Sequence, residues 1–442
     1  MINYINILIY TLFILSINKL SYAKTAYKGN FYAICGMILA LCIAIKDVNI
    51  SHLPYLTISI ILGALIGITY AKKVQMQNLP QMIALLNGFG GLSAGLIGIG
   101  EIITTTQTTF LHLFIVILGF ITFSGSIASF IKLTSNIKLA EEKIIRTTNF
   151  FIFILALLSA YYTYKIDDNY LFPLVLSFSI WSFLFVLPIG GADAPIIISI
   201  LNALSGWSTV LVGFSIYNPL LIITGSIIGS SGMILSHIMT KSMNRPLYNV
   251  LFPTKNISQE TLTQQTSHLS TPNDVAFLME NANKIIIVPG YGMAVASAQH
   301  EIANMAKILQ NKYHVDVKFA IHPVAGRMPG HMNVLLAEAD VDTDNIFELK
   351  DINQEFQTTD VVYVIGANDI TNPLAKTKID SPIYKMPILE VEQAKRIIFV
   401  KRSMSSGYAG IDNPLFYSDK TLMLLGDAKE VTKKIVTELE ED

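Results

Sequence analysis

The sequence predicts a multi-pass α-helical membrane bundle of about nine spans, followed by a C-terminal α/β Rossmann-like domain with a parallel sheet. Long apolar runs fill residues 1–245, residues 246–272 show no periodicity, and strand-like runs alternate with helical patterns from 273 to 442. The composition agrees, because 52% of the 442 residues are hydrophobic and only 14% are charged. We therefore expect a transmembrane domain, a linker and a second domain with its own core.

The membrane spans are predicted from apolar runs, since a helix crosses a bilayer with about 17 to 25 apolar residues. The first run lacks the basic start and the cleavage site of a signal peptide, so we expect it to be retained. The runs are Ile2–Leu20, Phe31–Ile45, Leu53–Ala71, Met82–Ile99, Thr109–Ile131, Asn149–Tyr164, Leu171–Leu187, Pro195–Phe214 and Pro219–Thr240.

Basic residues gather in alternate loops between these runs. One set of loops carries Lys19, Lys24, Lys28, Lys72, Lys73, Lys132, Lys138, Lys143, Arg146, Lys241 and Arg245, whereas the other carries only Lys46 and Lys165. The richer set faces the cytoplasm by the positive-inside rule, which places the N-terminus outside and residues 273–442 in the cytoplasm. A net charge of -1 without a basic stripe predicts no nucleic-acid partner.

Polar residues at membrane depth need partners, because the bilayer core supplies no water. Asn87, Asn202 and Ser205 lie within predicted spans, and Asp193 lies in a Gly-Gly-Ala-Asp turn on the cytoplasmic side. Two interpretations stay open for them, which are hydrogen bonding between helices and a wet path for protons. Small residues such as Gly91, Gly95, Gly225 and Gly229 have the spacing that lets helices pack closely.

The C-terminal part alternates strands and helices. The expected strands are Ile285–Val288, Val315–Ile321, Val361–Ile365, Arg396–Val400 and Leu422–Leu425. The expected helices are Met293–Asn311, about Gly330–Ala339 and Lys429–Glu440. This alternation predicts a parallel, doubly wound sheet. The preceding linker is rich in Thr, Ser and Gln between Pro253 and Pro272.

A glycine turn follows the first of these strands. Gly290 and Gly292 permit a tight turn and the approach of a pyrophosphate to the start of a helix, as in dinucleotide-binding folds. The third position of that fingerprint is Val295 rather than Gly or Ala. A turn with a purely structural role is the alternative.

A second cluster favours a dinucleotide that carries a 2′-phosphate. The strand ending at Val400 leads into Lys401, Arg402 and Ser403, which suit a phosphate through charge-assisted hydrogen bonds. The second strand is followed by Arg327 and no acidic residue that would bind a ribose 2′-hydroxyl. The alternative is that these basic residues are ordinary solvated charges on the surface and bind no phosphate.

Polar residues follow two further strands. Asn368 and Asp369 come directly after the strand ending at Ile365, so we expect them in the crevice, with an Asx turn or a helix cap as the alternative. Asp427 precedes the last helix and is predicted to be its N-cap.

These motifs resemble the bacterial beta subunit of the proton-translocating NAD(P) transhydrogenases. The similar segments are Gly290–Ala296, His322–Ala339, Gly366–Asp369, Lys401–Gly410 and Gly426–Lys429 in the C-terminal part, and Gly190–Asp193, Leu201–Trp207 and Gly229–Gly232 in the membrane part. The block 322–339 is the most specific, and the resemblance spans nearly the whole chain apart from the linker.

The resemblance implies a division of labour between two kinds of subunit. This chain would bind NADP(H) in its C-terminal domain, and an alpha subunit would bind NAD(H). Hydride would pass between the two nicotinamides while protons cross the bacterial inner membrane, in an assembly of two alpha and two beta subunits. The residues implied at the NADP(H) site, with Asp369 in a catalytic role, are Gly290, Tyr291, Gly292, Val324, Ala325, Gly326, Arg327, Met328, Pro329, Gly366, Ala367, Asn368, Asp369, Lys401, Arg402, Ser403, Gly407, Tyr408 and Asp427.

One position departs from the family pattern, because Asn87 stands where many relatives have a membrane histidine. Asparagine can order water but does not titrate near pH 7. We therefore predict a proton path past Asn87, Asp193, Asn202 and Ser205, with the titrating histidine supplied by the alpha subunit. The alternative function is a transporter or channel gated by a dinucleotide-sensing domain. No metal site is predicted.

Overall fold

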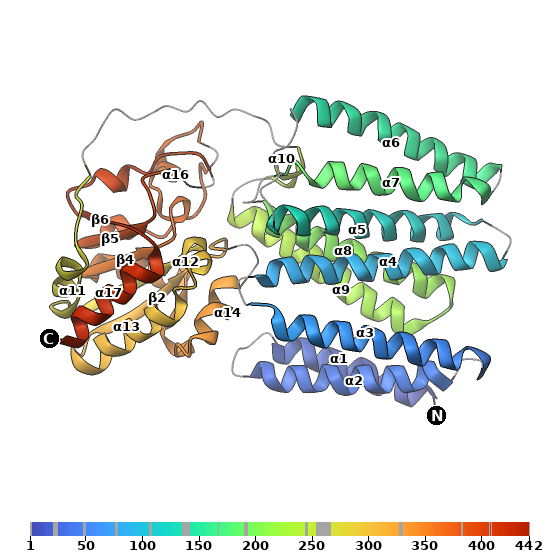
Figure 1. Ribbon diagram of the computed structural model, residues 1–442, viewed down its shortest axis with the longest axis horizontal. Coiled ribbons are helices and arrows are strands. Elements are labelled where there is room, and N and C mark those ends of the chain that lie inside the picture. The colour runs from blue at the N-terminus through green and yellow to red at the C-terminus, as the bar shows by residue number, and fades with distance from the viewer. Residues whose placement is uncertain are drawn as a thin grey trace. The chain divides into compact units, whose positions relative to one another are not determined.

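The computed structural model in Figure 1 falls into two compact units, which are described separately below. The residues that it describes are 2–20, 25–46, 50–75, 78–105, 108–134, 142–166, 168–189, 193–243, 246–252, 267–326, 330–381, 383–405, 407 and 409–441.

Nine apolar helices occupy the ranges predicted for the spans. They are α1 (Ile2–Leu20), α2 (Ala26–Lys46), α3 (Leu53–Lys73), α4 (Leu79–Thr105), α5 (Phe110–Thr134), α6 (Glu142–Lys165), α7 (Leu171–Val186), α8 (Ala194–Ser215) and α9 (Pro219–Ser242). Seven of them are long and apolar enough to cross a membrane, while α1 and α7 are shorter apolar helices. The predicted multi-pass bundle is confirmed; seven candidate spans are found among the described residues against about nine predicted, so the count is approximate.

Glycines let two pairs of these helices approach closely, as the spacing predicts. A Cβ atom on Gly119 of α5 would lie 2.5 Å from the backbone nitrogen of Gly95 on α4. A Cβ atom on Gly206 of α8 would lie 2.3 Å from the backbone nitrogen of Gly229 on α9. Any larger residue at either position would push the two backbones apart.

The second unit contains a six-stranded sheet in which all neighbouring strands are parallel, in the order β3-β2-β1-β4-β5-β6. The strands are β1 (Lys284–Pro289), β2 (Asp316–Ile321), β3 (Ile346–Glu348), β4 (Val361–Ile365), β5 (Arg396–Lys401) and β6 (Thr421–Leu425). This is the strand order of dinucleotide-binding folds, which reverses direction between β1 and β4. The edge strand β3 was not predicted, because three residues are too few to show a period of two.

The second unit also contains helices, several of which cover the sheet. The longer ones are α11 (Pro272–Glu280), α12 (Tyr291–Ala296), α13 (Gln299–Lys312), α14 (His331–Glu338) and α17 (Ala428–Glu441), and the short ones are α10 (Leu247–Leu251), α15 (Leu349–Ile352) and α16 (Leu374–Thr377). The predicted single helix Met293–Asn311 is wrong. Ser297 adopts a left-handed conformation with φ of 52°, which ends α12 before α13 begins.

The end of the predicted linker pairs with the sheet. The backbone N–H of Met423 in β6 donates to the carbonyl of His268 at 2.8 Å, and that of Ser270 donates to the carbonyl of Met423 at 3.0 Å. Thr271 then caps α11 in a capping box with Asp274. Residues 253–266 of the predicted linker lie outside the described residues.

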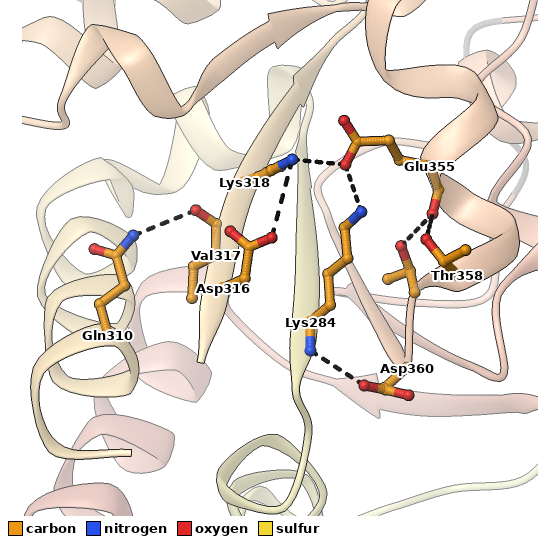
Figure 2. Close-up of polar contacts among 9 residues, drawn as sticks. Lys284, Gln310, Asp316, Val317, Lys318, Glu355, Thr358 and Asp360 are labelled. Carbon is orange, nitrogen blue, oxygen red and sulfur yellow. Dashed lines mark hydrogen bonds and ion pairs between the residues drawn. The ribbon is translucent and has the colours of Figure 1, made fainter. Parts of the chain in front are cut away.

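Charged side chains tie the strands together at the amino end of the sheet, as Figure 2 shows. One carboxylate oxygen of Glu355 accepts from both Lys284 on β1 and Lys318 on β2, the latter at 2.7 Å. Asp360 accepts from the backbone N–H of Lys284 at 3.1 Å and from Lys395 Nζ at 2.6 Å. Partial burial opposes ionisation of Glu355, but these two lysines hold its pKa below the usual value. The carboxyl end of the sheet carries the candidate site.

Candidate functional site

The loops at the carboxyl ends of β1, β2, β4 and β5 line a single cavity. Its lining includes most of the predicted site, namely Gly290, Tyr291, Gly292, Val324, Ala325, Gly326, Gly366, Ala367, Asn368, Asp369, Lys401, Arg402, Ser403 and Gly407. In parallel sheets, ligands bind outside the carboxyl ends of the strands, where the strand order reverses. The structure therefore brings these residues together at the place where such folds take their ligands.

The turn after β1 and the turn after β4 touch each other through their backbones. The N–H of Gly290 donates to the carbonyl of Ile365 at 2.9 Å, and that of Gly292 donates to the carbonyl of Gly366 at 2.9 Å. A Cβ atom on Gly290 would lie 2.4 Å from the Gly366 oxygen. The glycines after β1 are thus needed for this contact, whether or not a ligand is bound. Gly366 itself has φ of 66°, which favours glycine.

The loop after β2 forms a second wall of the cavity and is held by His322. This imidazole is buried, its Nδ1 accepts from the backbone N–H of Val324 at 3.2 Å, and its Nε2 lies 2.7 Å from the carbonyl oxygen of Pro387. Burial lowers the pKa of His322 to about 4, against the smaller opposing effect of the Pro387 carbonyl. The ring is therefore neutral at physiological pH.

The turn after β4 brings a carboxylate and an amide to the cavity. The Asp369 carboxylate accepts from the backbone N–H of Ala409 at 3.0 Å, which ties this turn to the segment after β5. A Cβ atom on Gly407 would lie 2.5 Å from Asp369 Oδ1, so that segment passes directly over the carboxylate. Both polar atoms of the Asn368 amide are buried, and neither has a hydrogen-bond partner among the described residues.

Lys401 is one of the charged groups that line the cavity. Its Nζ donates to the carbonyl of Ser405 at 2.7 Å and lies 4.1 Å from the centre of the Phe416 ring. Burial lowers the pKa of Lys401 to about 8, although the carboxylates of Asp412 and Asp369 act in the opposite direction. An anion entering the cavity would meet this partly desolvated amine.

Arg402 and Asp427 form an ion pair at the rim, with Arg402 Nη2 donating to Asp427 Oδ2 at 2.8 Å. Asp427 Oδ1 accepts from the backbone N–H of Lys429 at 3.0 Å, which supports the predicted N-cap of α17. Slight burial opposes ionisation of Asp427, but these bonds hold its pKa below the usual value. The cavity lining includes its neighbours Gly426 and Ala428 but not Asp427.

Four predicted site residues, Arg327, Met328, Pro329 and Tyr408, lie outside the described residues. The sequence did not predict roles at the site for His322, Pro323 and Ala409, which hold or line the cavity. His322 directly follows a strand, and that position was the one signal that could have marked it. Among the described residues, no group of three or more His, Cys, Asp and Glu is placed to hold a metal ion.

In the membrane unit, three of the predicted polar residues lie between α4 and α8. The Asn87 amide donates to the carbonyl of Ile198 at 3.4 Å, and a Cβ atom on Gly90 would lie 2.8 Å from Ser205 Oγ. Asn202 lies on α8 between Ile198 and Ser205, one turn from each, and so shares their face. Interhelical hydrogen bonding is therefore present at Asn87.

Asp193 is buried immediately before α8. Its carbonyl accepts from the backbone N–H groups of Ile196 at 3.1 Å and Ile197 at 3.2 Å, which begins the helix. Gly190, Gly191 and Ala192, the rest of the predicted turn, lie outside the described residues.

Comparison with known proteins gives consistent matches along the chain. A family model described as "NAD(P) transhydrogenase beta subunit" matches residues 2–438. Two curated relatives, both named "NAD(P) transhydrogenase subunit beta", come from Rhodospirillum rubrum and from a particular strain of that species. Each is 44% identical over 449 residues, a match that covers 96% of both proteins.

Proposed function

Because the chain belongs to the NAD(P) transhydrogenase beta-subunit family, we propose that it binds NADP(H) in the cavity at the carboxyl end of its sheet. The family is one of enzymes that use nicotinamide nucleotides, and a beta subunit implies an alpha partner. In the proposed reaction, NAD(H) is bound by that alpha subunit, and hydride passes between the two nicotinamides. The observation that carries the proposal is the placement of Lys401, Arg402 and Ser403 beside the β1–β4 reversal point.

The residues present fit NADP(H) in two parts of the cavity. Lys401 and Arg402 supply two positive charges and Ser403 a hydroxyl at the end of β5, which suits a 2′-phosphate. At the β1–β4 end, the buried Asn368 amide still has a donor and an acceptor to offer. Buried polar groups are almost always hydrogen-bonded in native proteins, so an amide in this condition indicates a ligand contact.

The chain's own groups would then bind and enclose the nucleotide, while the bound nicotinamide supplies or accepts the hydride. Arg402 would turn from Asp427 toward the phosphate. Asp369 would hold the segment of Gly407 and Ala409 over the site through its bond to the Ala409 N–H. The conformation of this segment would change with the bound nucleotide, and we expect Asp369 to transmit that change.

Proton translocation is proposed for the membrane unit. The α4–α8 interface carries Asn87, Asn202 and Ser205, which can order water but cannot store a proton. The titrating histidine would come from the alpha subunit, and Asp193 would relay the nucleotide state. We place the protein in a bacterial inner membrane with its C-terminal domain in the cytoplasm, as two alpha and two beta subunits, from the distribution of basic residues and the family resemblance.

One assay tests this function directly. Membranes that contain the chain and its alpha partner are given NADPH and an oxidised NAD analogue, and reduction of the analogue is followed together with proton movement. We expect both to occur and both to be lost with Lys401→Ala and Arg402→Ala combined. Nucleotide-dependent ion flux without any reduction of the analogue would instead identify a gated transporter.

A further inference from the structure

We propose that His322 is a positioning residue of the nucleotide site, which acts as a neutral tie between one wall of the cavity and the segment that follows Met386. The tie runs from the loop after β2, at Val324, to the segment that contains Pro387. The proposal rests on the proposed binding of NADP(H) in this cavity. It assigns to His322 no contact with the nucleotide and no proton transfer.

The two hydrogen bonds of His322 define its protonation state. A backbone N–H can only donate, so Nδ1 must accept from Val324 and cannot carry a proton. A carbonyl can only accept, so Nε2 must carry the proton that it donates to Pro387. With a single proton at Nε2, both bonds are satisfied, and the side chain is only 2% exposed. Neither a charged ring nor the other tautomer could make both bonds.

The first end of the tie fixes the loop that lines the cavity. The Ala325 N–H donates to the carbonyl of His322 at 3.0 Å, and the Gly326 N–H donates to that of Val324 at 3.0 Å. Together with the bond from Val324 to the ring, every backbone N–H from Val324 to Gly326 is held locally. Val324, Ala325 and Gly326 all line the cavity, so this wall has little freedom while His322 is in place.

The second end is anchored on the segment after Met386, a residue that itself lines the cavity. Asn353 donates to the carbonyl of Ile388 at 3.0 Å and accepts from the N–H of Glu390 at 3.0 Å. The Leu389 N–H donates to the carbonyl of Ile370, directly after Asp369, at 2.9 Å. The Pro387 carbonyl therefore belongs to a segment bonded to the turn after β4. His322 thereby sets the separation between the wall at 324–326 and the turn at Asn368 and Asp369.

Single substitutions can remove the two halves of the tie separately. In His322→Asn, the amide oxygen takes the place of Nδ1 and keeps the bond from Val324, but nothing reaches Pro387. In His322→Gln, the amide nitrogen takes the place of Nε2 and keeps the bond to Pro387, but Val324 loses its acceptor. His322→Phe removes both bonds while preserving a buried ring. The matched control is Tyr363→Phe, which removes another buried hydrogen bond, from Tyr363 to Thr432 at 3.0 Å, away from the cavity.

The experiment measures KM for NADPH, KM for the NAD analogue and kcat in membranes with the alpha partner, together with the thermal midpoint of each variant. We expect His322→Phe to raise KM for NADPH about tenfold and to leave KM for the NAD analogue unchanged. His322→Asn and His322→Gln should each raise it by a smaller factor. Tyr363→Phe should lower the thermal midpoint without changing either KM.

Two results would overturn the inference. One is an unchanged KM for NADPH in a folded His322→Phe or, if that variant does not fold, in His322→Asn and His322→Gln. The other is an equal rise in the Tyr363→Phe control, which would show a general effect of lost stability. Failure of the proposed function is distinguishable from both, because the unmodified protein would then reduce no NAD analogue.

Discussion

The guanidinium of Arg402 donates to the Asp427 carboxylate at 2.8 Å, across the rim of the cavity. Both side chains are substantially exposed, at 62% and 38%, and exposed pairs of this kind contribute only about 0–1 kcal/mol. Arg402 can therefore exchange Asp427 for a phosphate at little cost. Asp427 would still cap α17 through the N–H of Lys429 after the exchange.

The first prediction concerns the choice of dinucleotide. Lys401→Ala combined with Arg402→Ala removes the positive groups at the end of β5, and each lost charge-assisted contact costs about 1.5–3 kcal/mol, or roughly 10- to 150-fold in affinity. NADPH binding should weaken by at least that factor in a calorimetric titration, while weak binding of NADH stays as it was. Lys395→Ala is the control, because it removes an exposed positive charge that pairs with Asp360 and does not line the cavity, so NADPH affinity should not fall. Equal losses for both nucleotides would refute the assignment.

A second prediction follows from the lowered pKa of Lys401, which burial brings to about 8. The amine loses its positive charge as the pH rises through that value, so affinity for NADPH should fall by up to about tenfold per pH unit above it. Lys401→Arg should keep its affinity over the same range, because a guanidinium stays charged. Dissociation constants measured from about pH 7 to about pH 9.5 provide the check. The same slope in both proteins would show that another group titrates.

A third prediction concerns acid stability. The pKa of folded His322, about 4, lies below its ordinary value of 6.5, so folding favours the neutral ring. The contribution of neutral His322 to the free energy of unfolding is fully present above pH 6.5 and is lost as the pH falls toward 4. This shift in pKa corresponds to about 3 kcal/mol. Between pH 6.5 and pH 4, the free energy of unfolding of the wild type should fall by that amount relative to His322→Asn. Urea unfolding of residues 267–442 at pH 6.5 and at pH 4 measures the difference between the two proteins. A constant difference would mean that His322 already titrates normally.

Much of this architecture could be predicted from the sequence, because its determinants are local. Apolar runs of span length marked the nine helices, and buried β-branched runs marked five of the six strands. The break at Ser297 and the three-residue strand β3 were missed, because a helical period continues across Ser297 and β3 depends on pairing with β2. The site was predicted where polar or charged residues follow a strand directly, as at Lys401 and Asn368. The hydrogen bonds of His322 were not predicted, since its partner Pro387 lies 65 residues away along the chain.

The fourth prediction concerns the membrane unit. Asn87→Leu combined with Asn202→Leu removes both amides from the α4–α8 interface and should exclude water from it. Proton pumping and reverse transhydrogenation should slow together in reconstituted vesicles. The affinity of the isolated C-terminal domain for NADPH cannot change, because neither residue belongs to that domain. Full pumping by the double variant would show that protons cross elsewhere.

The most direct test of the account is a calorimetric titration of residues 267–442 alone with NADPH and with NADH. This segment retains the pairing of His268 and Ser270 with Met423, the Thr271 cap and all six strands, so it should fold and remain soluble. We predict that it binds NADPH with one site and binds NADH at least about tenfold more weakly. A folded segment that binds neither nucleotide, or binds both equally, would contradict the proposal that this cavity is an NADP(H) site.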